Sequence, residues 1–400
     1  MNELISVGVI LLLALLAGRI VKFLRVPEVT GYLLAGVALG PSVLGWVNEA
    51  NLNALGVLSE VALGLILFSI GTVFEIRQFR RIGKRLALIT LCEAGLSSGL
   101  VFGALLLTGQ PFQVALLLGI ISIETAAAST LMVLRECNAE GPLTNTLTGV
   151  FALDNLLCLF LFNVALIAFE YTRGAGLTLS AIGGSLFQLA WQFLGAMALG
   201  YLIGFLLAAW SRRVVEHGEQ LILLAGCVLL CVGTAKWLEV SALVANLTIG
   251  ATVVNLSART RRLFESLSQT DPPLYAIFFV LAGADLDISK VPTLGVMGLI
   301  YVGGRLIGKL FGTAIGARAT GLEKPARQWL PTSMLAQAGL AVGLTLTLSR
   351  RLPDLAGPVV TVVLSAVIIF EVIGPIAVRL SLVKSGESHP ETEVVEGVLT

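Results

Sequence analysis

Long apolar stretches recur along the whole chain and fix its fold class. A helix that crosses a bilayer needs about 20 mostly apolar residues, and its own hydrogen bonds must satisfy the backbone because water is absent. Charged residues make up 13% of the 400 residues, against about 25% in soluble domains. The sequence predicts an all-α membrane protein with about 13 transmembrane helices, approximately at 3–24, 28–46, 52–74, 84–108, 111–135, 142–170, 178–211, 217–237, 239–257, 270–288, 291–317, 326–349 and 356–384.

Basic residues are divided unevenly between the two sets of loops. Loops after odd-numbered segments, together with the C-terminus, hold 19 Lys and Arg residues, and the opposite loops hold five. Because cytoplasmic loops are enriched in Lys and Arg, we expect the N-terminus outside and the C-terminus in the cytoplasm. In the first segment the positive charge follows the apolar run, which is not the order of a cleavable signal peptide. This segment is therefore expected to remain as a transmembrane helix.

The two halves of the chain carry related short motifs. "LFSIGTVFEI" (67–76) and "FVLAGADLDI" (279–288) match at Gly71 and Gly283, which are 212 residues apart. "VTGYLLAG" and "VSALVANL" recur at nearly the same offset. This spacing predicts two six-helix repeats joined by one linking helix. Equivalent helices are then separated by an odd offset of about seven spans, which gives the repeats opposite topologies, an arrangement typical of secondary transporters.

This organisation predicts one transmembrane domain, residues 1–385. It consists of repeat one (about 1–172), the linking helix (about 178–211) and repeat two (about 217–384). Residues 386–400 are expected to form a short, disordered, acidic cytoplasmic tail.

Two spans contain runs of small and polar residues at equivalent places in the two halves. They read "SIETAAAST" (122–130) and "TSMLAQAGLAVG" (332–343). Such runs occur where helices pack closely. They also occur where a helix is interrupted and its freed backbone groups line a cavity. The matching positions favour two broken helices.

Ionisable residues inside the spans are candidates for function, because a charge in the bilayer costs several kcal/mol. Arg305 and Lys309 are four residues apart and therefore share one helix face. Asp154 lies in the middle of an apolar run and is the natural partner for Lys309. Glu60 and Asp285 are near span ends and are expected to be structural. The acidic candidates are Glu60, Glu93, Glu124, Asp154, Asp285 and Glu371.

Other chemistries find little support. The net charge of +1 gives no reason to expect binding to nucleic acid. Cys227 and Cys231 share a helix face but have no nearby His or acidic partner, so they are interpreted as small core residues. "GGRLIGKL" has the glycine and lysine spacing of a phosphate-binding loop, but Leu310 replaces the required Ser or Thr and the segment is apolar.

Six motifs occur in order along the chain: "VPEVTGYLLAGVALGPSVLG", "GLILFSIGTVFEIRQFRRIGKR", "FFVLAGADLDIS", "GKLFGTAIGARATG", "LAQAGLAVGL" and "FEVIGPIAV". Together they resemble the motifs of the monovalent cation:proton antiporters, in the branch with Kef-type and bacterial sodium/proton exchangers. The resemblance covers residues 1 to about 385 and implies a homodimer, in which a dimerisation domain adjoins a mobile core domain with two crossing broken helices. No regulation through a Kef-type cytosolic nucleotide-binding domain is expected.

The resemblance also implies roles for individual residues. The family's sixth span carries an Asp-Asp or Asn-Asp pair whose second member binds the ion. Here Asp154 stands at the first position and Asn155 at the second, which departs from that pattern. In Asp-Asp relatives the first aspartate pairs with a lysine, which aligns with Lys309. Gln337 matches the glutamine of the second crossover, and Glu124 is an addition to the first.

These assignments predict a secondary antiporter, not an enzyme, that exchanges a monovalent cation, most simply sodium, for protons by alternating access. Asp154 would bind sodium with Asn155, Thr125, Glu124 and freed backbone carbonyls, and without the cation it would take a proton or pair with Lys309. A single switching carboxylate at the centre predicts electroneutral exchange. Potassium/proton exchange, a cation channel and an inactive membrane scaffold are the alternatives.

The remaining candidates have supporting roles. Arg305 is grouped with Lys309 in salt bridging and proton coupling, Ser129 with Gln337 in lining the broken helices, and Glu371 is expected to be a gating or structural acid. No cofactor is expected, and the partners are the ions, a second copy of the chain and the lipid bilayer. The expected location is the bacterial inner (plasma) membrane.

Overall fold

The chain is helical throughout its described parts. The computed structural model describes residues 3–24, 26–41, 43–47, 49–72, 74–172, 184, 187–188, 190–211, 213–214, 216–256, 260–285 and 295–389, and these contain no strand. Seven helices in them are long and apolar enough to cross a membrane. The helices are α1 (Glu3–Phe23), α2 (Glu28–Leu39), α3 (Glu49–Gly71), α4 (Ile76–Leu107), α5 (Phe112–Ile121), α6 (Ala127–Glu136), α7 (Pro142–Thr172), the π-helical turn η1 (Trp191–Gly195), α9 (Ala196–Trp210), α10 (His217–Trp237), α11 (Ala242–Leu256), α12 (Thr260–Ala284), α13 (Gly295–Ala319), α14 (Lys324–Ser333), α15 (Gly339–Arg351) and α16 (Pro353–Ser385).

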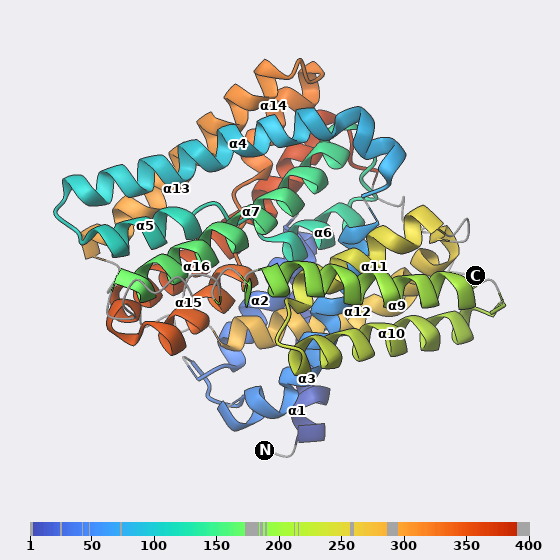
Figure 1. Ribbon diagram of the computed structural model, residues 1–400. Coiled ribbons are helices and arrows are strands. Elements are labelled where there is room, and N and C mark those ends of the chain that lie inside the picture. Colours follow the sequence, from blue (N-terminus) through green and yellow to red (C-terminus); the bar gives the residue numbers. More distant parts are fainter. Residues whose placement is uncertain are drawn as a thin grey trace.

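The helices form two groups (Figure 1). We call α4 to α7 with α13 to α16 the core group, and α1 to α3 with α9 to α12 the scaffold group. One cluster of buried apolar side chains lies inside the core group, and a second lies among α3, α9, α10 and α11 of the scaffold group. A third cluster joins the groups and includes residues of α2, α3, α6, α7 and α12.

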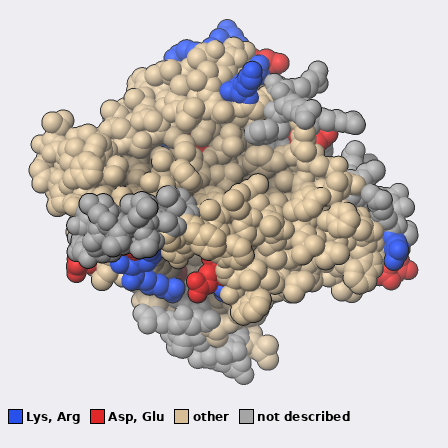
Figure 2. Space-filling view, in the orientation of Figure 1, with Lys and Arg blue, Asp and Glu red and all other residues tan. Residues whose placement is uncertain are grey.

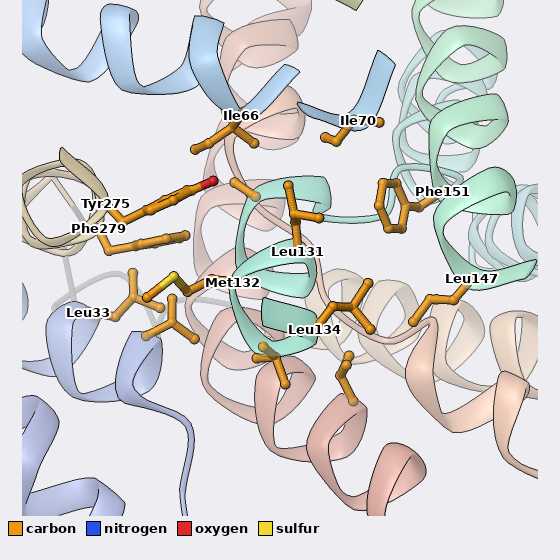
Figure 3. Packing of buried hydrophobic residues seen from close by; sticks show 14 of the residues in the cluster. Leu33, Ile66, Ile70, Leu131, Met132, Leu134, Leu147, Phe151, Tyr275 and Phe279 are labelled. Atoms are coloured by element: carbon orange, nitrogen blue, oxygen red, sulfur yellow. The ribbon is translucent and has the colours of Figure 1, made fainter. Parts of the chain in front are cut away.

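Helix α6 lies at this junction. Figure 3 shows Leu131 and Met132 of α6 pointing toward Tyr275 and Phe279 of α12 and toward Ile66 of α3. Leu134, on the same helix, lies toward the core-group helix α7. A short apolar helix therefore supplies much of the contact between the two groups.

The expected interruptions occur in both spans that the small and polar runs marked. α5 ends at Ile121 and α6 begins at Ala127, while α14 ends at Ser333 and α15 begins at Gly339. The intervening residues, 122–126 and 334–338, are not helical. Their backbone groups therefore need partners from elsewhere, because each buried N–H or C=O left without one costs free energy.

Glycines hold α4 and α13 close together. A Cβ on Gly308 would lie 2.8 Å from the Ser97 backbone nitrogen, and one on Gly312 would lie 2.7 Å from the Glu93 Cα. The two helices therefore touch backbone to backbone, as is usual where small residues face each other in membrane proteins. This seam brings the polar residues of α4 directly against Arg305 and Lys309 of α13.

Two further glycine contacts cross the scaffold group. A Cβ on Gly36 of α2 would lie 2.9 Å from the Gly283 Cα of α12, and a Cβ on Gly71 of α3 would lie 2.9 Å from the Gly250 Cα of α11. Each contact joins a helix from the first half of the chain to one from the second.

The surface is consistent with a lipid environment. Figure 2 shows a broad surface without charged side chains, with Lys, Arg, Asp and Glu mainly near its margins. An uncharged surface of this extent is rare on soluble monomers, and it is expected where a protein faces hydrocarbon. The chain is therefore an integral membrane protein.

Some boundaries differ from those expected. The segment 28–46 is helical only to Leu39 and then turns. In the segment 178–211, the described helical structure consists mainly of η1 followed directly by α9. Most of 178–189 and all of 286–294, including the Asp287 and Ile288 motif positions, lie outside the described residues.

The segment expected to be a disordered tail begins with an ordered contact. The carboxylate of Glu387 accepts the backbone N–H of Leu143 at 2.7 Å and the backbone N–H and hydroxyl of Thr144, both at 2.8 Å. Amides in the first turn of a helix have no partner within the helix, so a carboxylate placed there is stabilised. Glu387 is thus part of the folded structure, and residues 390–400 lie outside the described residues.

The glycine crossings yield a stability test. Gly250→Val should lower the free energy of unfolding by about 1–3 kcal/mol through overpacking, because its Cβ would meet the Phe68 carbonyl oxygen. Thermal unfolding of the purified protein in detergent measures this. Gly233→Val in α10 is the matched control, because nothing lies within 4 Å of its Cβ position. Equal melting temperatures for the two variants would contradict the packing argument.

Candidate functional site

The two helix interruptions meet in the middle of the core group. The backbone N–H of Ala126 donates to the carbonyl of Ala336 at 3.1 Å. The backbone N–H of Ala338 donates to the carboxylate of Glu124 at 3.2 Å. Segments more than 200 residues apart in sequence thus complete part of each other's hydrogen bonding.

Arg305 supplies the donors that both interruptions lack. Its guanidinium donates to the carbonyls of Leu335 at 2.8 Å, Ala336 at 3.0 Å and Glu124 at 2.7 Å. It also lies 4.3 Å from the ring centroid of Phe370, a cation–π contact. Arg305 was expected to act with Lys309 in salt bridging and proton coupling. Its hydrogen bonds go to backbone carbonyls, because the planar fork faces the two broken helices.

Lys309 lies one turn further along the same helix and is fully buried. Its ammonium lies 2.5 Å from the Ile123 carbonyl, 2.7 Å from the Thr125 hydroxyl, 2.5 Å from a Glu93 carboxylate oxygen and 3.4 Å from a carboxylate oxygen of Asp154. The structure therefore brings Lys309 and Asp154 together, and it places Glu93 closer to the ammonium than Asp154.

Asp154 is completely buried on α7 and only partly satisfied. Its Oδ2 accepts the Thr125 hydroxyl at 2.9 Å, while its Oδ1 has no hydrogen-bond partner among the described residues. A buried polar atom without a partner is unusual in a folded protein and calls for an explanation such as an ion or water. Asn155, the next residue, accepts the Thr125 backbone N–H at 3.4 Å and so faces the same interruption.

The other predicted residues lie around this centre. Gln337 donates to the Ile121 carbonyl at 3.2 Å and to the Tyr301 hydroxyl at 2.7 Å. Ser129 donates to the buried carboxylate of Glu371 at 3.4 Å. Both contacts lie beside the interruptions and not at Asp154.

The acids expected to be structural lie at the surface. Glu60 pairs with Lys236, and both side chains are substantially exposed. Asp285 is exposed at the end of α12.

The oxygen atoms around Asp154 fit a hard monovalent cation better than a resident metal. Carboxylate, hydroxyl and carbonyl oxygens are the ligands that such cations prefer. Within the described residues no cluster of three or more His, Cys, Asp or Glu side chains has the arrangement of a metal site. Cys227 and Cys231 are free thiols, and Cys231 is buried in the scaffold core.

Sequence reasoning missed two contributors to the site. Tyr301 was not singled out, although it lies one turn before Arg305 on the same helix face, which is the available signal. Glu93 was recognised as an intramembrane acid, but its contact with Lys309 depends on the glycine seam between α4 and α13. That seam joins residues more than 200 positions apart.

The fold and this centre define a helical membrane transporter with a buried, charged site between interrupted helices. The chain belongs to the family described as "Sodium/hydrogen exchanger, transmembrane", whose profile matches residues 9–384.

Among curated proteins the chain is similar to the ammonium/H⁺ antiporter subunit AmhT of Alkalihalophilus pseudofirmus, with 24% identity over 80% of each chain. It is also similar to a Na⁺/H⁺ antiporter of Enterococcus hirae, with 25% identity over 85% of this chain and 88% of the relative. An iron transporter, MagA of Paramagnetospirillum magneticum, is 26% identical over 85% of this chain and 75% of the relative.

The fold is that of a solved antiporter. The sodium proton antiporter MjNhaP1 of Methanocaldococcus jannaschii superposes with a TM-score of 0.70 at 17% identity, covering 96% of this chain and 99% of that chain. The similarity extends over the whole membrane domain. At this level of identity it establishes the fold alone.

The contacts of Arg305 yield a second test. Arg305→Met should lower the free energy of unfolding by about 3 kcal/mol or more, because three buried carbonyls lose a charged donor. Arg305→Lys should rescue little, since one ammonium cannot reproduce the planar fork. Thermal unfolding in detergent is the measurement, and Arg350→Met, at an exposed position at the end of α15, is the control. A melting temperature of Arg305→Met equal to that of the native protein would show that the hydrogen bonds of Arg305 to the interruptions do not stabilise the fold.

Proposed function

We propose that this protein is a secondary antiporter that exchanges sodium for protons by alternating access. The observation that carries the proposal is Asp154, a fully buried carboxylate beside two helix interruptions, with one oxygen that has no hydrogen-bond partner in the described residues. A buried carboxylate can hold either a proton or a monovalent cation, and competition between the two produces exchange. The family to which the chain belongs supports this assignment.

Sodium binding would use groups already near Asp154. The Thr125 hydroxyl donates a hydrogen bond to the Asp154 carboxylate. The Ile123 carbonyl accepts from the Lys309 ammonium, which also contacts Asp154. Asn155 and Glu124 are the further candidates for ligands. On binding, sodium would take the place of Lys309 next to Asp154, and the oxygens of the interruption would replace part of its water shell.

Alternating access would follow from movement of the core group against the scaffold group. The site residues come from core-group helices, whereas α6 meets the scaffold group through apolar side chains and, at its C-terminal end, through two hydrogen bonds that movement would have to break, Arg135 to the Ser69 hydroxyl and the Glu28 backbone N–H to Glu136. Apolar contacts have no fixed direction, and they permit sliding more readily than hydrogen bonds do.

An inverted repeat with 13 spans is the architecture we infer. The number is reached when each interrupted pair, α5 with α6 and α14 with α15, is counted as one span and η1 is also counted together with α9. The interruptions begin at Ser122 and Met334, which are 212 residues apart. This is the offset between Gly71 and Gly283.

The glycine crossings support the same repeat. Gly71 corresponds to Gly283 at the offset of 212, and Gly36 has Gly250 near the equivalent position, at an offset of 214. Gly36 touches Gly283, and Gly250 touches Gly71. A two-fold relation between the halves requires such an exchange of partners, whereas chance glycine contacts do not.

We further propose a homodimer in the bacterial plasma membrane, with the N-terminus outside and the C-terminus in the cytoplasm. The distribution of Lys and Arg between the loops supports this orientation. The resemblance to the antiporter family supports the dimer. The proposed domain is the membrane unit of residues 1–385, extended by the contact of Glu387 with α7.

We propose sodium, and not potassium, as the transported cation. The family is described for sodium and hydrogen exchange, and the Enterococcus hirae relative is named for the same ions. Proton flux driven by imposed ion gradients in proteoliposomes tests the choice. Sodium should drive flux at lower concentration than potassium, a channel would show uncoupled leak, and a scaffold would show none.

Asp154→Asn should abolish sodium-driven proton flux, because it removes the group that binds either ion. The variant should still insert and fold, since Asn fills the same volume. Flux in proteoliposomes is the measurement, and Asp354→Asn, at an exposed position in the first turn of α16, is the matched control. Sodium-dependent flux retained by Asp154→Asn would show that another acid, such as Glu124 or Glu371, carries the ion.

Exchange should be electroneutral if one carboxylate switches per cycle. One proton then moves for each sodium, and no net charge crosses the membrane. The reversal point, measured in liposomes clamped at different membrane potentials with equal ion gradients, should not depend on voltage. Asn155→Asp, which adds a second carboxylate, is expected to introduce voltage dependence. A native reversal point that follows the potential would refute the single-carboxylate account.

A further inference from the structure

More oxygen acceptors surround the Lys309 ammonium than it has N–H groups to donate. An ammonium carries three N–H groups. Four oxygens surround it, and the three nearest belong to Ile123, Glu93 and Thr125, at 2.5 to 2.7 Å. Asp154 is the fourth, at 3.4 Å. Among these oxygens, the Glu93 carboxylate is the negative charge nearest to the ammonium, and Asp154 is the most distant acceptor.

The two carboxylates depend on Lys309 to different degrees. Asp154 also accepts the Thr125 hydroxyl. Glu93 lies 2.5 Å from the Lys309 ammonium and also adjoins the Asp154 carboxylate, so Lys309 is the cation that compensates its burial. Removing one member of a buried ion pair leaves the other charge uncompensated at high cost. Glu93 therefore cannot release Lys309 as readily as Asp154 can.

The backbone also fixes Glu93 and Lys309 to each other. They face across the glycine seam of α4 and α13, where a Cβ on Gly312 would lie 2.7 Å from the Glu93 Cα. Asp154 belongs to a third helix, α7. The other charged groups nearby, Arg305 and Glu124, are engaged by the backbone of the interruptions.

We propose that Glu93, rather than Asp154, is the permanent counter-ion of Lys309, and that it thereby keeps Asp154 available to the transported cation. This inference rests on the proposed function. Glu93 is a positioning residue in this account, because it acts on sodium through the lysine. Without it, Asp154 would be the remaining counter-ion of Lys309, and the ammonium would move closer than the present 3.4 Å and compete directly with sodium.

Transport kinetics test this in proteoliposomes, with sodium-driven proton flux measured over a range of sodium concentrations. Glu93→Gln should raise the half-saturating sodium concentration at least about tenfold, because the ammonium then competes at Asp154. The maximal rate should stay near the native value. A merely structural role would lower the amount of folded protein and the rate without moving the half-saturation.

Two further variants make the test specific. In Glu93→Gln/Lys309→Gln the competitor is gone, so half-saturation should fall at least about threefold below that of Glu93→Gln alone. Glu93→Asp keeps the charge on a shorter side chain, so its half-saturating sodium concentration should lie between those of the native protein and Glu93→Gln. If Glu93→Gln does not fold, a rise in half-saturation for Glu93→Asp supports the proposal. Glu60→Gln, at a surface ion pair of α3, is the control and should behave as native.

The outcomes separate the two proposals. A native protein without sodium-coupled proton flux would refute the proposed function. A native protein that transports, with Glu93→Gln or Glu93→Asp at native half-saturation, would refute only the role of Glu93. A double variant no better than Glu93→Gln would do the same, since it would show that the lysine does not compete.

Discussion

Two buried cations on one helix hold the centre of this protein together. Arg305 and Lys309 lie on the same face of α13 and donate to carbonyls of both interrupted spans. An interrupted helix in a membrane has backbone groups that water cannot reach, so donors from neighbouring helices must satisfy them. The interruptions could not be stable in this form without α13, and the site would not exist without the interruptions.

The carboxylates solve the opposite problem. Two cations in a low-dielectric interior need negative charge nearby, and Glu93, Glu124 and Asp154 supply it from three different segments. These acids are not equivalent. Glu124 accepts a backbone N–H of the other interruption, Glu93 lies 2.5 Å from the lysine, and Asp154 accepts the Thr125 hydroxyl and lies 3.4 Å from the lysine. The three acids therefore differ in which group compensates their burial.

Much of this arrangement could be predicted from the sequence because membrane insertion leaves strong signals. Apolar length predicts the spans, and runs of small and polar residues predicted both interruptions at the observed places. The pairing of Asp154 with Lys309 follows from the scarcity of charge inside spans. The hydrogen bonds of Arg305 could not be predicted from the sequence, because every residue has a backbone carbonyl and residue types do not show which carbonyls are the acceptors. The contact of Glu93 with Lys309 required the register of α4 on α13, which depends on three-dimensional packing at Gly308 and Gly312.

The contact between Glu387 and the start of α7 has a consequence for the order in which the protein is made. The amides of Leu143 and Thr144 receive their partner from a residue more than 240 positions later. Until almost the whole chain has left the ribosome, the helix that carries Asp154 lacks this stabilising charge at its first turn. The first turn of α7 can therefore gain this stabilisation only after α16, the helix that precedes Glu387, has been synthesised.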